Sequence, residues 1–124
     1  MNKGFLSGSV LRHVNFVKRE DDERMDSIWF IMYEKAKYPC ADGGYRFATN
    51  YVLCEATGRT ARLIQEHYPA GAPCLFEGYI KSVNHKGKYL TIFHILVTHS
   101  TAKWQGENDL ADHLAEFNGM WDTE

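Results

Sequence analysis

The chain has 124 residues, of which 44% are hydrophobic and 24% are charged. These are ordinary values for a globular protein, so they exclude collagen-like, wholly disordered and membrane-embedded chains, and the length suits one domain. No apolar run approaches the roughly 18 residues that cross a bilayer, and the N-terminus lacks the basic start and apolar stretch of a signal peptide. We therefore predict a cytoplasmic protein that does not associate with membranes.

The net charge of −2 is unevenly distributed along the chain. Residues 1–100 hold 13 Lys and Arg against 10 Asp and Glu, whereas residues 101–124 hold one Lys against six acids. Five of the acids in the first part lie in the acidic loop, residues 20–26. The remainder of the first part is basic enough to face phosphate groups, although simple solvation of the surface explains these numbers at least as well.

The first part of the sequence predicts two strands separated by an exposed loop. Apolar and polar residues alternate from Lys3 to Val14, which is typical of a strand. The inner face of this strand is expected to hold Leu6, Val10 and Val14. The acidic loop is polar and has no periodicity, so it should be exposed. Residues 28–33 are apolar on both faces, which suits a second strand covered on each side.

Turn signals and a helical pattern follow. Residues 39–44 are rich in proline and glycine and predict a hairpin turn, after which residues 45–55 alternate as a third strand. A short helix should then begin at a cap formed by Thr57 or Thr60 and stop before Pro69. Its apolar side is expected to carry Ala61, Ile64 and Tyr68.

Two further strands complete the predicted fold. The fourth strand has an expected inner face of Cys74, Phe76, Gly78 and Ile80. Residues 85–87 form a tight turn, and residues 88–98 alternate as a fifth strand. The order βββαββ is that of the OB fold, an all-β, five-stranded barrel that commonly binds oligonucleotides on its central strands. An antiparallel sheet with a packed helix in another wrapping is the alternative.

We assign residues 1–100 to this barrel domain and residues 101–124 to an acidic C-terminal tail. A helical pattern in the tail is formed by Leu110, Leu114 and Phe117. The tail is either a mobile segment or a weakly docked helix. Its predicted function is to recruit replication proteins.

Three stretches of the chain resemble the bacterial single-stranded DNA-binding protein family. Residues 2–12 (Asn-Lys-Gly-Phe-Leu-Ser-Gly-Ser-Val-Leu-Arg) are similar to the family's first strand, residues 51–53 to the segment before its helix, and residues 74–81 to its fourth strand. Residues 6–10 and 77–81 are also similar to primosomal replication protein N, of the same superfamily. The resemblance implies an OB fold that binds single-stranded DNA with little sequence preference during replication, recombination or mobile-element maintenance.

The chain departs from the family pattern at several places where the family contacts DNA. Residues 13–15 (His-Val-Asn) replace an Asp-Pro, Ala48 and Cys54 stand near the family's stacking aromatics, and His85 replaces a tryptophan at the hairpin tip. The last residues, 119–124, lack the family's terminal Asp-Asp-Ile-Pro-Phe type motif. DNA contacts therefore cannot be transferred directly.

Single-stranded nucleic acid is held by aromatic rings that stack on bases and by a cationic groove that follows the phosphates. Tyrosines and histidines beside lysines and arginines occur at three places that should converge in this fold. The predicted DNA-binding residues are Arg12, Tyr33, Lys35, Lys37, Tyr38, Tyr45, Arg46, Tyr79, Lys81, His85, Lys86, Lys88 and Tyr89. The residues expected to fill the barrel instead are Phe30, Phe47, Phe76 and Phe93.

Trp29 and Met32 should point to opposite faces of the second strand, so that one of them lies outside the barrel. A dimer interface would cover such a residue, and we predict self-association as a dimer or tetramer. The alternative is that the helix or the acidic tail covers it within one chain.

The sequence predicts neither catalysis nor a cofactor. Its six histidines show no zinc-binding spacing, and no glycine-rich phosphate loop is present. Cys54 and Glu55, with His94 or His99, could form a thiol nucleophile and base, but no oxyanion loop accompanies them. The three cysteines are expected to be free thiols. The alternative to DNA binding is a protein-interaction OB module of a primosome-like replication complex with weak or no DNA binding.

Overall fold

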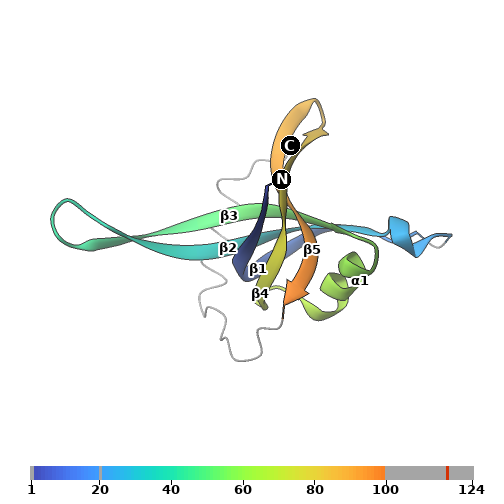
Figure 1. Ribbon diagram of the computed structural model, residues 1–124, viewed down its shortest axis with the longest axis horizontal. Helices are drawn as coiled ribbons and strands as arrows, with labels where there is room; N and C mark the ends of the chain where they lie inside the picture. The colour runs from blue at the N-terminus through green and yellow to red at the C-terminus, as the bar shows by residue number, and fades with distance from the viewer. Residues whose placement is uncertain (1, 20, 100–116, 118–124) are drawn as a thin grey trace.

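Five strands close into a barrel beside one helix in the computed structural model, which describes residues 2–19, 21–99 and 117 (Figure 1). The elements in chain order are β1 (Lys3–Val17), the 3₁₀ turn η1 (Glu23–Met25), β2 (Ser27–Pro39), β3 (Tyr45–Thr57), α1 (Gly58–His67), β4 (Pro73–His85) and β5 (Lys88–His99). The strands follow one another around the barrel in the order β1-β2-β3-β5-β4, and β4 pairs with β1 to close it. The predicted all-β barrel with the order βββαββ is confirmed.

The interior of the barrel is filled by alternate residues of the strands and covered at one side by α1. Phe30, Phe76 and Phe93 are buried there, as predicted, and Ala61 and Ile64 of the helix pack against the same cluster. Burial of large aromatic rings supplies much of the stability of a small core. The helix therefore belongs to the barrel core.

Two glycines allow neighbouring strands to approach closely. A Cβ atom on Gly8 would collide with the backbone carbonyl of Tyr33, and one on Gly78 would collide with the backbone carbonyl of His94. Because both carbonyls belong to the backbone, any larger residue at these positions would force the adjacent strand to move.

The β2–β3 hairpin extends beyond the barrel as an arm, which we call the β2–β3 arm (residues 34–50) (Figure 1). The sequence predicts a second strand over residues 28–33, but β2 continues to Pro39 and stays paired with β3 down to Tyr45. The continuation was missed because it is polar and exposed, and so lacks the apolar signal of a buried strand.

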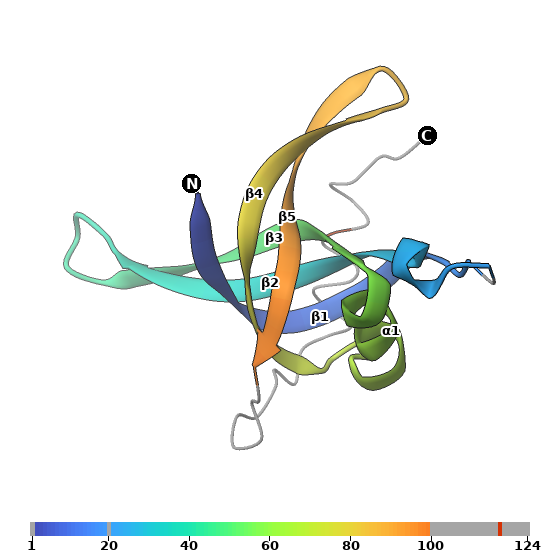
Figure 2. The same cartoon turned by 45° about the vertical axis from the view of Figure 1, so that its right-hand side comes forward.

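A second hairpin, the β4–β5 arm (residues 80–92), leaves the barrel in another direction (Figure 2). The predicted tight turn is confirmed at its tip, where Lys86 and Gly87 have positive φ angles of 53° and 81°. Two successive residues with positive φ form the type I′ turn that best matches the twist of a hairpin.

Three predicted side-chain positions are wrong. Phe47 was expected in the barrel but is 64% exposed, and Ile80 was expected to point inward but is 56% exposed, because both lie where their strands have left the barrel. Val14 is 43% exposed because the pairing of β1 with β2 shifts register twice after Val10. Thr57, one of the two predicted cap residues, does occupy the N-cap position of α1, and its side chain makes no capping hydrogen bond.

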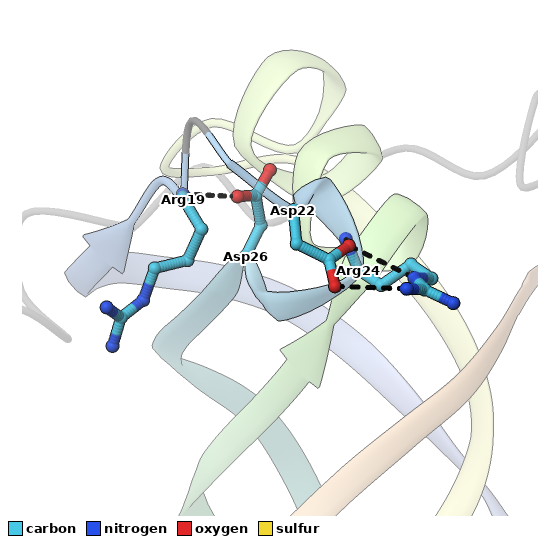
Figure 3. A network of polar contacts seen from close by, with 4 residues as sticks. All are labelled: Arg19, Asp22, Arg24 and Asp26. Carbon is cyan, nitrogen blue, oxygen red and sulfur yellow. Dashed lines mark hydrogen bonds and ion pairs between the residues drawn. The ribbon is translucent and has the colours of Figure 1, made fainter.

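The acidic loop was predicted to be exposed, but Asp26 is completely buried. Its carboxylate accepts a hydrogen bond of 2.6 Å from the backbone N–H of Arg19 (Figure 3). The same carboxylate pairs at 2.8 Å with the guanidinium of Arg62 on α1. Asp22 accepts hydrogen bonds from the side chain and the backbone N–H of Arg24, which lower the pKa of Asp22. The connection between β1 and β2 is therefore fixed to the helix.

β5 ends at His99, and of the predicted acidic tail (101–124) only Phe117 lies within the described residues. The helices in the described part of the chain are too short or too polar to cross a membrane.

Candidate nucleic-acid interface

A second apolar cluster lies on the outer face of the barrel, opposite the core. It alternates with the core along β2 and β3, so its side chains point away from the interior. We call it the outer cluster, and it consists of Leu11, Ile31, Tyr33, Leu53, Ile92 and Phe117, with Trp29, Tyr51, Val83 and Leu90 packed at its edge.

The predicted division of Trp29 and Met32 between two faces is confirmed. Met32 is in the barrel core, whereas Trp29 lies at the edge of the outer cluster. The Trp29 ring packs against His85 of the β4–β5 arm, with 5.6 Å between ring centres, and its Nε1 donates a 3.1 Å hydrogen bond to Glu55. Trp29 is thus half-buried against residues of its own chain.

The β2–β3 arm carries lysines and aromatic rings on the same face as the outer cluster. Residues paired across antiparallel strands point to the same face, and this rule places Lys35, Lys37, Tyr45 and Phe47 together. The Nζ of Lys37 lies 4.2 Å from the centre of the Tyr45 ring, and that of Lys35 lies 5.9 Å from the centre of the Phe47 ring. Both rings are more than half exposed. We call these four residues the arm stripe.

The other predicted residues on the arms do not share this face. Tyr38 and Arg46 pair with each other on the opposite face of the β2–β3 arm. Lys86, Lys88 and Tyr89 are exposed at the tip of the β4–β5 arm. Two of the three predicted places therefore meet on the β2–β3 arm, whereas the third lies on the β4–β5 arm, which leaves the barrel in another direction (Figure 2). The arms meet only at their bases, around the outer cluster.

Three of the predicted residues are already engaged with their own chain. Tyr33 is buried in the outer cluster, with 1% of its surface exposed, so its ring cannot stack on a base. Lys81 forms a 2.6 Å ion pair with Glu55, and the Tyr79 ring packs on His94 at 5.1 Å between centres. The sequence predicts DNA contacts for them because a tyrosine beside a lysine gives the same local pattern whether it binds DNA or packs within its own chain.

Glu55 is the centre of a polar cluster at the bases of both arms. Its Oε1 lies 2.6 Å from Lys81 Nζ and 2.7 Å from His94 Nδ1, and its Oε2 accepts the hydrogen bond from Trp29. Burial raises the pKa of Glu55, but hydrogen bonds from Lys81 and His94 outweigh it, so the pKa is lowered overall. The carboxylate is therefore charged at neutral pH and links β2 and β3 to β4 and β5.

Arg12 reaches the outer face through the first register shift of β1, where it stands opposite Ile31. It lies beside Phe117, whose ring also packs against Tyr51. Tyr51 is not among the predicted DNA-binding residues, although the predicted hairpin turn indicates which face it lies on. A hairpin turn at residues 40–44 pairs Tyr51 with Tyr33, and so places it on the face of the arm stripe.

The thiol chemistry considered from the sequence is not assembled. Cys54 is buried in the barrel core, whereas Glu55 and His94 meet on the outer face. Burial raises the pKa of Cys54 well above its usual value and that of Cys74 to about 12, so both thiols stay protonated and unreactive. Cys40, Cys54 and Cys74 are free thiols, as predicted. Within residues 2–19, 21–99 and 117, no His, Cys, Asp and Glu cluster suits a metal ion.

No protein-family model and no curated protein sequence matches the chain, but solved structures do. A deletion variant of the single-stranded DNA-binding protein from Thermus aquaticus matches with a TM-score of 0.70 and 13% identity, over 87% of this chain and 54% of the other. The SSB of Plasmodium falciparum, solved in complex with ssDNA, matches with a TM-score of 0.65 and 13% identity, over 81% and 96%. The protein PriB from Ralstonia solanacearum matches with a TM-score of 0.58 and 12% identity, over 80% and 97%.

The chain has the OB fold of these proteins. The resemblance seen in three stretches of sequence is thereby confirmed at the level of the fold. The chain spans about half the length of the Thermus aquaticus protein.

Proposed function

We propose that this protein binds single-stranded DNA with little sequence preference through the arm stripe, the adjoining outer face and the tip of the β4–β5 arm. The arm stripe is the observation that carries the proposal, because it places two exposed rings and two lysines on one face of a projecting hairpin. Stacking of a base on such a ring contributes about 1–3 kcal/mol, and the lysines can follow the phosphates.

This chemistry explains both the preference for unpaired strands and the tolerance of sequence. Every base has a flat face that can stack on Tyr45 or Phe47, whereas a duplex keeps those faces inside its own stack. Single-stranded RNA offers the same faces and phosphates, so it is a second ligand of the same class.

The cellular setting of the proposal is DNA replication, recombination or mobile-element maintenance in the cytoplasm, without catalysis. The solved complex of the Plasmodium falciparum SSB with ssDNA supports the ligand. Self-association as a dimer or tetramer, and contacts of the acidic tail (101–124) with replication proteins, are further parts of the proposal. Sedimentation velocity of the purified chain would establish the oligomeric state.

Replacing both rings of the arm stripe tests the interface directly. In fluorescence anisotropy with a labelled oligothymidine, the double variant Tyr45→Ala and Phe47→Ala should bind at least about tenfold more weakly than the wild type, because two stacking platforms are lost. Phe5→Ala is the matched control, since Phe5 is 68% exposed on β1, outside the arms. Equal losses in both variants, or no loss in either, would contradict the assignment of the arm stripe.

A further inference from the structure

The β4–β5 arm is a two-stranded ribbon whose two faces differ. On one face, Val83 and Leu90 pair across the strands and pack against the outer cluster. The opposite face, which we call the ribbon face, is formed by two further cross-strand pairs, and all of its side chains are exposed. Its members are Ser82, Thr91, Asn84 and Tyr89. The ribbon face therefore points away from the outer cluster, into solvent.

The residue types of this arm suit the backbone of DNA. Hydroxyl and amide side chains, such as those of the ribbon face, donate hydrogen bonds to phosphate oxygens, and lysines neutralise the phosphate charge. Residues 80–92 include three Lys and neither Asp nor Glu. Two of these lysines, Lys86 and Lys88, are exposed at the tip of the arm. The arm thus offers phosphate contacts without a carboxylate of its own that would repel them.

The shape of the β4–β5 arm suits a duplex. The major groove of B-DNA is about 12 Å wide and admits a two-stranded β-ribbon. The turn at Lys86 and Gly87 is of the tight two-residue type, so the tip is no wider than the two strands. The β2–β3 arm instead presents the exposed rings of Tyr45 and Phe47, which stack on unpaired bases. The two arms are therefore suited to different forms of DNA.

The directions of the arms match a DNA molecule that changes form. Both arms start around the outer cluster and leave the barrel in different directions (Figure 2). A junction between single strand and duplex has such a layout, because the single strand bends freely whereas a duplex stays straight over about 150 base pairs. A tail that follows the arm stripe to the outer cluster would bring the adjoining duplex to the base of the β4–β5 arm.

We propose that the β4–β5 arm binds the duplex that adjoins the single strand, so that the protein prefers a junction to either form of DNA alone. The proposal rests on the proposed function and narrows the part that the tip of this arm plays in it. A separate duplex binds weakly because the arm offers few contacts. At a junction, the bound tail holds the duplex at a high effective concentration, and the same contacts then add to the affinity.

Fluorescence anisotropy with labelled DNA tests this preference. The ligands are an oligothymidine, the same oligothymidine as a tail on a duplex, the duplex alone, and an oligothymidine as long as the longer strand of the junction. At one salt concentration, the junction should bind at least about tenfold more tightly than either oligothymidine. Equal affinity for the junction and the longer oligothymidine would overturn the proposal. Absence of binding to every ligand would instead contradict the proposed function.

Removing the charges at the tip separates the two forms of DNA. The double variant Lys86→Asn and Lys88→Gln keeps the backbone of the turn, since asparagine tolerates the positive φ of 53° at position 86. It should lose most of the gain at the junction and keep its affinity for oligothymidine within about twofold, because the tail does not contact the tip. Lys18→Gln with Arg59→Gln removes two exposed cations outside both arms and should keep the gain.

Two results with the tip variant would overturn the proposal. Equal losses for the junction and for oligothymidine would place the tip on the single strand. A smaller sedimenting species than the wild type would assign the arm to contacts between copies of the chain.

Photocrosslinking locates the duplex on the protein. Tyr89 is 76% exposed, so p-benzoylphenylalanine can replace it without disturbing the barrel. At this position it should crosslink to the duplex part of the junction, whereas at position 45 it should crosslink to the tail. Crosslinks from position 89 to the tail alone would overturn the proposal.

Discussion

Glu55 shows how one side chain joins several strands of the barrel. Its carboxylate bonds to Lys81 of β4, His94 of β5 and Trp29 of β2, close to the point from which both arms start. The side chain is 13% exposed, so these contacts are only weakly screened by water. Such a group should make folding sensitive to acid.

The pH dependence of stability tests this role. The pKa of Glu55 is lower in the folded chain than in the unfolded one, so its contribution is fully present above the unfolded value and is lost as the pH falls through the folded value. Glu55→Gln should therefore flatten the loss of stability below about pH 4.5, and lower the free energy of unfolding at pH 7 by about 1–2 kcal/mol.

Urea denaturation between pH 7 and pH 3 would measure both effects. Glu77→Gln is a useful comparison, since hydrogen bonds from Lys3 and His99 lower the pKa of Glu77 and both of these partners are more exposed than those of Glu55. Glu77→Gln should flatten the pH dependence of the free energy of unfolding less than Glu55→Gln does. An acid sensitivity of Glu55→Gln equal to that of the wild type would contradict the role assigned to Glu55.

Burial of single aromatic residues could be predicted only in part. Phe30, Phe76 and Phe93 lie in the core, as their apolar character indicates, but Tyr33 is buried and Phe47 is exposed, the reverse of the expectation. Residue type favours phenylalanine inside and tyrosine at the surface. What decides these two positions is where the hairpin leaves the barrel, and alternation along the strand does not contain that information.

Among the elements, the connection between β1 and β2 is fixed to α1 through Asp26. Asp26 is fully buried and pairs with Arg62 of α1, and the backbone carbonyl of Asp26 accepts a 2.8 Å hydrogen bond from Gly58 N–H at the start of the helix. The sequence predicts only an acidic, exposed loop here. The partner of Asp26 lies 36 residues further along the chain, and local composition cannot reveal such a contact.

Asp26→Ala should lower the free energy of unfolding by about 3 kcal/mol, the low end for breaking a buried ion pair, because Arg62 is partly exposed and can recover water. Chemical denaturation in urea would measure the change. Asp21→Ala, in the same loop but exposed, should change stability by no more than about 0.5 kcal/mol. Similar small effects of both substitutions would contradict the anchoring role.

For the molecule as a whole, the fold was accessible from sequence and the layout of the interface was not. Turn residues such as Gly43 and Gly87, both at positive φ, and the helical pattern that includes Ile64 give the order of elements, which is enough to select an OB fold. The directions of the two arms depend on strand twist. Arg12 reaches the outer face through a register shift, and the contact between Phe117 and Tyr51 joins residues far apart in the chain. None of these features leaves a local signal in the sequence.

The most direct measurement is fluorescence anisotropy of labelled oligothymidine, titrated with the wild-type protein at two salt concentrations beside a duplex of equal length. We expect tight binding of the single strand and little binding of the duplex. We also expect the logarithm of the association constant to fall by about 0.7 per unit of log salt concentration for each phosphate contact. Absence of single-strand binding at low salt would contradict the proposed function and favour a protein-interaction module on the same barrel.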